Sequence, residues 1–441
     1  MKYLTRIGVP LALLLPILCC SSNPYKNTEP GGESGKEIQE KPGPENPEEQ
    51  TRPYVENLAL PEDPAAISEA LGLGWNLGNQ LDAIVNGVSS ETCWGNPLCT
   101  QKTFYGVKDA GFTSVRIPVT WMGHMGSAPS YQVDEAWMNR VAEVVQYARN
   151  AGLYVIINTH HDENHGDDHW LDIKGASEDS ALNESIKQQI SALWTQIATK
   201  FADCGNWLIM EGFNELNDGG WGWSEDFRKN PMKQGGILNE WNQVFVSAVR
   251  ATGGNNATRW LGVPTYCANP SFETYLTLPE DPRLMLSVHF YDPSDYTIGD
   301  KQYSDWGHTG SVGKKAQGAD EDHVRQVFEN LNTKYVARNI PVYVGEFGCS
   351  MRSKADSRAW AFYLYYLEYV VKAAKTNNLP CFLWDNGVAG PGKEHHGVLD
   401  HATGDYISYS KDVIDVLVKA RFTQDASYTL DSVYDSAPVF Q

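Results

Sequence analysis

Hydrophobic and polar positions follow two different periods along most of the chain. Short apolar runs rich in β-branched residues are separated by longer stretches in which apolar residues recur at helical spacing. The runs that predict strands are 71–77, 114–119, 154–158, 207–213, 260–263, 284–289, 342–346 and 381–384. The clearest amphipathic stretches, which predict helices, are 133–151, 183–201, 236–252, 320–338 and 354–377. Strands that alternate with helices indicate a parallel sheet wrapped by helices.

Eight strand and helix units predict the α/β class, as a (β/α)8 TIM barrel with inserted loops in preference to a doubly wound sheet. After residue 55 there is neither a second low-complexity stretch nor an internal repeat. We therefore expect residues 56–441 to form a single domain.

The first twenty residues have the composition of an export signal. Lys2 and Arg6 precede an apolar run at 7–18, which is too short for a membrane span of roughly 20 residues. The run ends at Cys19 and Cys20, one of which would be acylated in a bacterial lipoprotein signal. We predict a lipoprotein-type signal peptide over 1–20, with simple secretion as the alternative.

Residues 21–55 are rich in Pro, Gly and Glu and contain few large apolar side chains. Such a segment cannot bury enough surface to offset its ordering entropy, so it is predicted to be a flexible tether. We expect an exported protein, held at the outer membrane or cell surface as a lipoprotein, or otherwise periplasmic or extracellular. Its contact with a membrane would be through the lipid anchor only.

The balance of charge excludes one class of partner. With 35 Lys and Arg against 55 Asp and Glu, the formal net charge is −20, which repels phosphate backbones, so no nucleic acid partner is expected. Fourteen Trp and 22 Tyr offer flat rings for stacking on sugars as well as for packing. The predicted oligomeric state is a monomer.

The cysteines outside the signal suggest no metal. Their spacing resembles no zinc site. An exported protein can form disulfides, and Cys93 with Cys99 is the first pair to consider, with buried free thiols as the equal alternative.

Polar side chains gather at the carboxyl ends of the predicted strands, where barrels of this type carry their functional groups. They are Asn76, Asn79, Arg116, His160, His161, Asn214, Glu215, His289, Tyr291, Glu346 and Trp384. Charged groups at so many strand ends are hard to explain by packing.

Glu215 and Glu346 follow the fourth and seventh predicted strands. Across a small barrel two such carboxyl groups can approach to about 5 Å, which suits a nucleophile and an acid acting on one glycosidic bond. Asn214 could donate to the sugar hydroxyl beside the reacting carbon, and Tyr291 to the carboxylate of the nucleophile. Arg116 could keep Glu346 ionised by its opposite charge, or form a purely structural ion pair.

Several motifs together resemble glycoside hydrolase family 5. They are Arg116-Ile117-Pro118, Asn158-Thr159-His160-His161-Asp162, Asn214-Glu215, His289-Phe290-Tyr291, Gly345-Glu346-Phe347-Gly348 and Trp384-Asp385-Asn386-Gly387. The resemblance covers residues 71–387. Gly74-Trp75-Asn76-Leu77-Gly78-Asn79 and Cys93-Trp94-Gly95-Asn96-Pro97 are most similar to the branch rich in bacterial endoglucanases.

The resemblance implies a retaining endo-acting β-glycanase that cuts β-1,4-glucan through a covalent glycosyl-enzyme intermediate, with 56–441 as its catalytic domain. It implies Glu215 as acid/base and Glu346 as nucleophile. The implied shell that binds substrate is Arg116, His160, His161, Asn214, His289, Tyr291, Trp384 and Asn79. Trp384 would be the platform beneath the sugar on the non-reducing side. A β-glucan polysaccharide or oligosaccharide would be the partner, and no cofactor or metal is expected.

One position departs from the family pattern. The family often has Pro after the acid/base, where this chain has Leu216, followed by a loop with Trp221 and Trp223. These tryptophans either add a stacking surface on the leaving-group side or are surface aromatics without that role.

Other functions remain open at this point. A xyloglucan- or mixed-linkage-specific endoglucanase would share the machinery, as would a β-mannanase. A non-catalytic glycan-binding lipoprotein would be expected to lose a carboxylate, and both are present. A metal cluster of His160, His161, Asp162, His165, Asp167, Asp168 and His169 is disfavoured, because neighbours in a strand face opposite sides.

Overall fold

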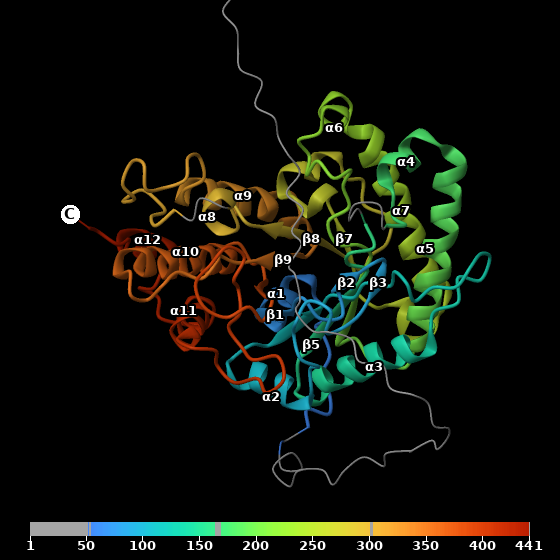
Figure 1. Cartoon of the computed structure of the whole chain (residues 1–441), viewed down its shortest axis with the longest axis horizontal. Helices are drawn as coiled ribbons and strands as arrows, with labels where there is room; N and C mark the ends of the chain where they lie inside the picture. The colour runs from blue at the N-terminus through green and yellow to red at the C-terminus, as the bar shows by residue number, and fades with distance from the viewer. Residues whose placement is uncertain (1–51, 53, 164–168, 300–302, 441) are drawn as a thin grey trace, which may run out of the picture. The chain divides into compact units, whose positions relative to one another are not determined.

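Eight parallel strands close into a barrel in the computed structural model, which describes residues 52, 54–163, 169–299 and 303–440. The barrel lies at the centre of Figure 1, and its order is β1-β10-β9-β8-β7-β6-β5-β4. The strands are β1 (Leu73–Leu77), β4 (Ser114–Ile117), β5 (Tyr154–Asn158), β6 (Leu208–Glu211), β7 (Leu261–Pro264), β8 (Leu284–Phe290), β9 (Val342–Phe347) and β10 (Cys381–Asp385). β1 pairs with both β10 and β4, which closes the ring.

The (β/α)8 prediction is therefore confirmed, and the differences lie at strand ends. The first strand begins two residues later than predicted, because Leu71 ends a short helix and Gly72 turns the chain at a φ of 60°. The second ends at Ile117, since Pro118 has no N–H to donate to a neighbouring strand. The predicted signal at 1–20 and nearly all of the tether at 21–55 lie outside the described residues.

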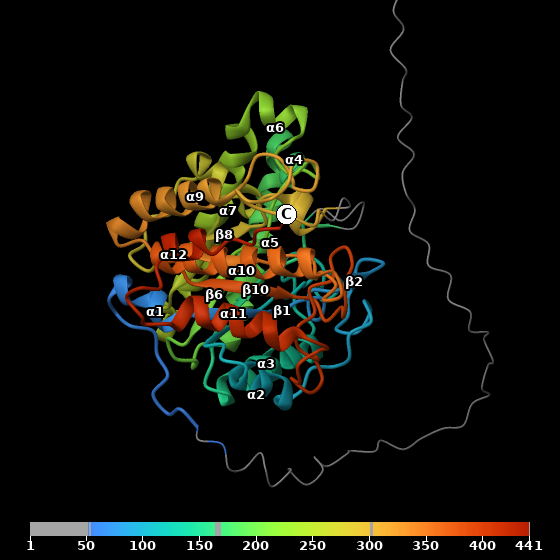
Figure 2. The ribbon, with the colours of Figure 1, turned by 90° about the vertical axis from the view of Figure 1, so that its left-hand side faces the viewer.

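Helices follow the strands and cover the outside of the barrel (Figures 1 and 2). They are α1 (Ile67–Leu71), α2 (Gln101–Asp109), α3 (Glu135–Asn150), α4 (Ile173–Glu178), α5 (Ser180–Lys200), α6 (Glu225–Lys229), α7 (Pro231–Ala251), α8 (Ser294–Thr297), α9 (Glu321–Lys334), α10 (Ser357–Thr376), α11 (Ser410–Phe422) and α12 (Leu430–Asp435). β2 (Ile84–Val85) and β3 (Val88–Ser89) form a small antiparallel ribbon.

Side-chain caps explain where the predicted helices begin. The Asp134 carboxylate accepts the backbone N–H of Ala136, so α3 begins at Glu135. Asp179 accepts two N–H groups, from Ala181 and Leu182, so α5 begins three residues before the predicted 183. Such oxygens satisfy backbone donors that have no partner inside the helix.

The inside of the barrel has its own apolar floor, separate from the larger core between strands and helices. Ile156, Ile209, Met285 and Phe382 belong to this floor cluster and are fully buried. Their neighbours along the strands belong to the outer core, as the alternation of side chains in a strand requires. Because apolar groups fill this end, polar groups can gather only toward the other.

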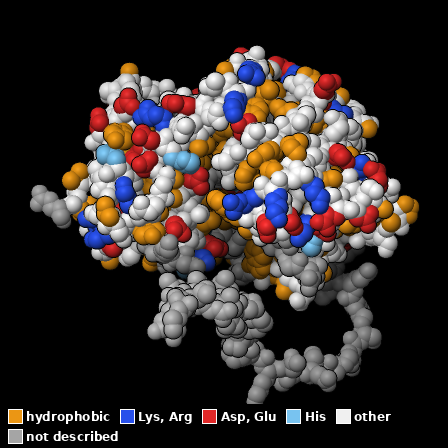
Figure 3. Space-filling model, turned by 90° about the horizontal axis from the view of Figure 1, so that it is seen from above, with side chains coloured by type: hydrophobic (Ala, Val, Ile, Leu, Met, Phe, Trp, Pro, Cys, Tyr) orange, Lys and Arg blue, Asp and Glu red, His pale blue; other side chains and the backbone are white. Residues whose placement is uncertain are grey.

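Other predictions concern the surface and the thiols. On the face seen in Figure 3, acidic and basic side chains are interspersed rather than gathered by sign. Cys93 and Cys99 are free thiols, as are Cys204, Cys267, Cys349 and Cys381, so the disulfide alternative is not realised in this structure. No helix among the described residues combines the length and hydrophobicity that a membrane crossing requires.

Candidate active site

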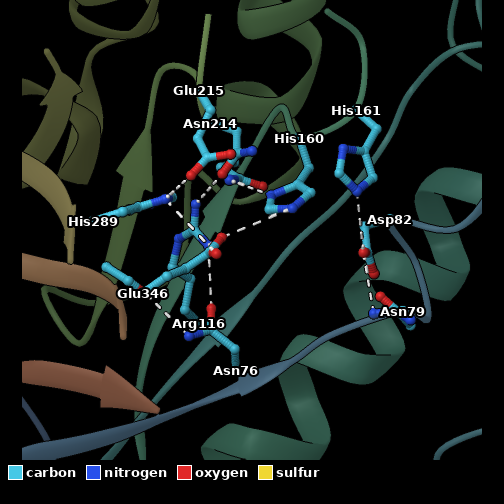
Figure 4. Close-up of polar contacts among 12 residues, drawn as sticks. Asn76, Asn79, Asp82, Arg116, His160, His161, Asn214, Glu215, His289 and Glu346 are labelled. Carbon is cyan, nitrogen blue, oxygen red and sulfur yellow. Dashed lines mark hydrogen bonds and ion pairs between the residues drawn. The ribbon is translucent and has the colours of Figure 1, made fainter. Parts of the chain in front are cut away.

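Arg116, at the carboxyl end of β4, is the centre of the polar network (Figure 4). Its side chain is fully buried and donates to the Glu211 carboxylate through Nη2 at 2.7 Å and Nε at 3.1 Å. It also donates to Glu346 Oε1 at 2.8 Å, to Asn214 Oδ1 at 2.8 Å and to Asn76 Oδ1 at 3.1 Å. One guanidinium thus fixes side chains from β1, β6, β9 and the turn after β6.

Glu346 lies near the end of β9 and is held on both carboxylate oxygens. Arg116 contacts Oε1, and the Tyr291 hydroxyl donates to Oε2 at 3.0 Å, as the sequence led us to expect for Tyr291. Burial raises the pKa of Glu346, although His289 and Arg116 pull it down. Arg116 thus acts in the direction expected from the sequence, toward the ionised form, but the loss of hydration is the larger effect and the pKa of Glu346 is raised.

Glu215 has different surroundings. Burial raises its pKa to about 7, and no guanidinium hydrogen bond to its carboxylate is present in the described part of the chain. His289 Nδ1 lies 2.6 Å from Glu215 Oε1. Burial lowers the pKa of His289 to about 4, so this imidazole is neutral near pH 7. Glu215 beside a neutral His289 therefore keeps its proton at pH values between its ordinary pKa and about 7, at which an ordinary glutamate is ionised.

The two carboxyl groups meet at the mouth of the barrel. One oxygen of Glu215, one of Glu346 and a ring nitrogen of His289 all lie within 4.8 Å of one another. The separation agrees with the roughly 5 Å found where one carboxylate attacks a sugar carbon and the other protonates the leaving oxygen.

His160 and His161 lie closer together than residues in a strand would. β5 ends at Asn158, so the alternation of faces has stopped, and the two rings are 4.4 Å apart. Together with Asp82 they offer three ligand atoms within 4.8 Å of one another. The Asp82 carboxylate already accepts the backbone N–H groups of Asn79 and Gln80.

Among its described members, the larger metal cluster considered from sequence does not assemble around one point. Asp162 is buried and accepts the N–H groups of Trp121 and Trp170 instead. His165, Asp167 and Asp168 lie outside the described residues, and His169 lies near Asp172.

A cavity of about 800 Å³ contains the remaining predicted residues. Trp384 lines it and lies parallel to the His160 ring at 5.8 Å between centroids. Asn79 and His161 line the same region, and His161 lies 5.5 Å from the ring of Trp94. Nine of the eleven predicted residues line this cavity, and Asn76 and Arg116 belong to the network beneath it.

Sequence reasoning missed four residues of this region. Glu211 is the last residue of the apolar strand β6, and Asp82 lies in a loop three residues after the motif that ends at Asn79. Glu163 is buried and accepts the Asn214 side-chain N–H at 3.2 Å and the backbone N–H of Glu215 at 3.3 Å. Trp94 belongs to the motif at 93–97, and only the structure shows that it lines the cavity. A carboxylate within the apolar run predicted as a strand at 207–213 is the signal that could identify Glu211.

Comparison of the chain with known protein families agrees with the geometry of the site. Residues 79–390 match the model of the cellulase family, glycosyl hydrolase family 5. The chain belongs to this family and is a glycoside hydrolase, so the resemblance seen in the sequence is confirmed.

Sequence relatives and solved structures that resemble this chain also include endoglucanases and cellulases. Endoglucanase A of Paenibacillus barcinonensis is 37% identical over 344 residues, which are 74% of this chain and 83% of that protein. A solved broad specificity endoglucanase from Bacteroides salanitronis is 51% identical, with a TM-score of 0.80 over 83% of this chain and 98% of that one. A solved Bacteroidetes-affiliated cellulase linked with a polysaccharide utilization locus has a TM-score of 0.82 and 44% identity, over 85% of this chain and 98% of that one.

Proposed function

We propose that this chain is a retaining endo-β-1,4-glucanase in which Glu346 is the nucleophile and Glu215 the acid/base. The observation that carries the proposal is the approach of the two carboxyl groups to within 4.8 Å in unequal surroundings. Glu346 receives hydrogen bonds from Arg116 and Tyr291, which favour the ionised form. Glu215 has a pKa near 7 and contacts a neutral histidine.

In the first step, the Glu346 carboxylate attacks the anomeric carbon and the bond to the leaving oxygen breaks. Glu215 gives its proton to that oxygen, so a shortened chain leaves with a new hydroxyl group. The remaining glucan is bound to Glu346 as an ester. Before this step, Arg116 and Tyr291 stabilise the negative charge of the Glu346 carboxylate. During both steps they hold its orientation.

In the second step, the Glu215 carboxylate takes a proton from water while the water oxygen attacks the anomeric carbon. The ester bond to Glu346 breaks, and both glutamates return to their starting protonation states. Two inversions give net retention, and no step requires a redox partner.

The surrounding residues have separate tasks in this scheme. The Asn214 amide oxygen is held by Arg116, and its N–H group contacts Glu163, which fixes the side chain beside the reacting sugar. His289 Nδ1 lies 2.6 Å from Glu215 Oε1, and this neutral imidazole favours the protonated form of the Glu215 carboxyl. Trp384 offers a flat face within the cavity for one sugar ring.

We propose cellulose-type β-1,4-glucan as the backbone that is cut, with xyloglucan or mixed-linkage glucan as the alternative. One relative, from Bacteroides ovatus, is a xyloglucan-specific endo-beta-1,4-glucanase, 35% identical over 73% of this chain and 64% of that protein. The 51% identical structure is a broad specificity endoglucanase. A non-catalytic glycan-binding protein has less support, since both carboxylates are present and assembled. A β-mannanase would share these carboxylates, and it has less support because the relatives named above are endoglucanases.

A substrate panel tests this proposal. Initial rates would be measured on carboxymethylcellulose, mixed-linkage glucan, xyloglucan and mannan. We expect the highest rate on one of the three glucans and the lowest rate on mannan. Highest activity on mannan would contradict the proposed substrate. Binding of all four without hydrolysis would contradict the proposed enzyme.

We also propose export and anchoring through an acylated cysteine, with a monomeric catalytic domain. Support comes from Lys2 and Arg6, the apolar run at 7–18 and the pair Cys19 and Cys20. Expression of the full chain in a bacterium with labelled palmitate should yield a labelled protein, and replacement of both cysteines by Ala should remove the label. Release of unlabelled wild-type protein into the medium would favour simple secretion.

A further inference from the structure

A third carboxyl group lies beside the catalytic pair. Glu163 belongs to the loop after β5, and only 3% of it is exposed. Its Oε1 accepts the side-chain N–H of Asn214 at 3.2 Å and the backbone N–H of Glu215 at 3.3 Å. One oxygen of Glu163 therefore contacts both the acid/base and the residue before it.

The other oxygen of this carboxyl has no such contact. Glu163 Oε2 is buried, and no hydrogen bond to it is present in the described structure. Nor does any described Lys or Arg form an ion pair with Glu163. A buried carboxylate with one unpaired oxygen and no counter-ion has a far larger desolvation cost than a neutral carboxylic acid. The contacts of Glu163 therefore suit its protonated form.

The charges around Glu163 act in the same direction. Burial raises the pKa of Glu163 well above its ordinary value, and the negative charges of Glu215 and Asp162 raise it further. The hydrogen bonds from Asn214 and the Glu215 backbone oppose this shift but do not cancel it. Burial also raises the pKa of Cys267, which follows β7, so this neighbouring thiol adds no charge.

Asn214 is held at both ends of its amide group. Arg116 donates to Oδ1 at 2.8 Å, while one Nδ2–H points to Glu163. The other Nδ2–H has no acceptor among the described residues, and Asn214 lines the cavity. This N–H is free for the sugar hydroxyl beside the reacting carbon, a hydrogen bond that strengthens in the transition state. The contact with Glu163 thus fixes the amide before substrate arrives.

The protonation state of Glu163 matters most in the second step. Glu215 then acts as a base, so its carboxylate is ionised beside Glu163. An ionised Glu163 would place two negative charges side by side and would oppose this ionisation. A neutral Glu163 accepts the same two hydrogen bonds without that repulsion.

We propose that Glu163 is a positioning residue of this site, a neutral carboxylic acid that fixes Asn214 and the Glu215 backbone without adding charge beside the acid/base. This inference rests on the proposed function and on the roles given there to Asn214 and Glu215. It predicts that catalysis needs an oxygen acceptor at position 163 and does not need a negative charge there.

Two substitutions separate the acceptor from the charge. Glu163→Ala removes the acceptor and should lower kcat on cellohexaose by about ten- to hundredfold, with a smaller change in KM. Glu163→Gln has an amide oxygen for the same two N–H donors and no charge, so it should recover most of the lost kcat. Glu329→Ala, at an exposed position, is the control and should match the wild type.

A substrate without the 2-hydroxyl isolates the effect on Asn214. On an aryl β-cellobioside, Glu163→Ala should lower kcat/KM about as much as on cellohexaose. The matched analogue lacks the 2-hydroxyl on the sugar that carries the aryl group. On this analogue the variant should lie within about threefold of the wild type, because the contact that Glu163 supports is already missing.

The pH profile tests the neutral form of Glu163. Glu163→Gln should leave the alkaline limb of kcat/KM at its wild-type position, because it removes no charge. Glu211→Gln is the positive control, since the pKa of Glu211 is lowered and this carboxylate is ionised. Its loss should shift the same limb to lower pH, because the charge of Glu211 raises the pKa of Glu215.

Four results would overturn the inference while leaving the proposed function intact. The first is a Glu163→Ala variant with the kcat of the wild type. The second is an equal loss on the aryl cellobioside and its 2-deoxy analogue, which would indicate a purely structural role. The third is a Glu163→Gln variant as impaired as Glu163→Ala, and the fourth is a Glu163→Gln alkaline limb that moves to lower pH. A wild-type enzyme that cleaves neither cellohexaose nor the aryl cellobioside would overturn the proposed function itself.

Discussion

Glu211 forms an ion pair with Arg116, whose Nη2 lies 2.7 Å from Glu211 Oε1, and both side chains are fully buried in the barrel. Glu211 also accepts the Tyr343 hydroxyl at 2.6 Å and an Asn158 N–H at 3.1 Å. Burial opposes its ionisation, but Arg116 outweighs this and lowers the pKa of Glu211. Arg116 is therefore already neutralised by one carboxylate when it contacts Glu346. The Arg116–Glu211 pair has no net charge, so the contact with Glu346 brings one net negative charge to the site.

Glu211→Gln should move the pH dependence of activity. The negative charge of Glu211 raises the pKa of Glu215, so its loss should shift the alkaline limb of kcat/KM to lower pH. Stability should also fall, by about 3 kcal/mol, because a buried ion pair loses one charge. The control Glu329→Gln removes the same charge from an exposed position and should leave the limb in place. An unchanged alkaline limb in the folded Glu211 variant would contradict this role.

The wild-type pH profile of kcat/KM should be bell-shaped. Activity requires a protonated Glu215, whose pKa is about 7, so the rate should fall as the pH rises through that value. It also requires an ionised Glu346, whose pKa burial raises above its ordinary value, so the rate should fall again in acid. Steady-state rates from pH 4 to 9 would measure both limbs. A rate that stays flat to pH 9 would mean that no acid of this kind is needed.

Glu215→Gln should distinguish the acid from the nucleophile by the leaving group. With cellohexaose, whose leaving alcohol needs a proton, kcat/KM should fall by about 10² to 10⁴. With a dinitrophenyl cellobioside, whose leaving group needs none, the first step should be nearly unaffected in a pre-steady-state burst. Equal loss on both substrates would argue against Glu215 as the acid. Glu346→Gln should abolish turnover of both.

Two glycine substitutions test the packing of the barrel. At Gly74 in β1 a new Cβ would lie 2.0 Å from the Phe382 ring, inside the floor cluster. Gly74→Ala should therefore lower the free energy of unfolding by about 1 to 3 kcal/mol. At Gly236 in α7 nothing lies within 4 Å of the new atom, and Gly236→Ala should raise stability by about 0.5 to 1 kcal/mol. Thermal melts of both variants measure the difference. Equal melting temperatures would contradict the packing argument.

The sequence predicted the barrel because strand and helix periods are local signals. Eight apolar runs needed no knowledge of their partners, and residues such as Glu215 and Glu346 stood out because a charge directly followed each apolar run. Long-range relations were not predictable in the same way. Nothing near Asp82 indicates that it meets His161, since 79 positions of chain separate them and only the pairing of β4 with both β1 and β5 brings them together. Likewise, the opposing effects of burial and Arg116 on Glu346 depend on solvent exclusion, which no local pattern reports.

The assignment of the two glutamates is tested most directly by trapping the covalent intermediate. An activated 2-deoxy-2-fluoro-β-cellobioside slows both steps, while its good leaving group keeps the first faster than the second. After proteolysis, mass spectrometry should find one fluorocellobiosyl group per chain, attached to Glu346. A label on Glu215, or continued hydrolysis of a glucan with no labelled peptide at all, would contradict the account.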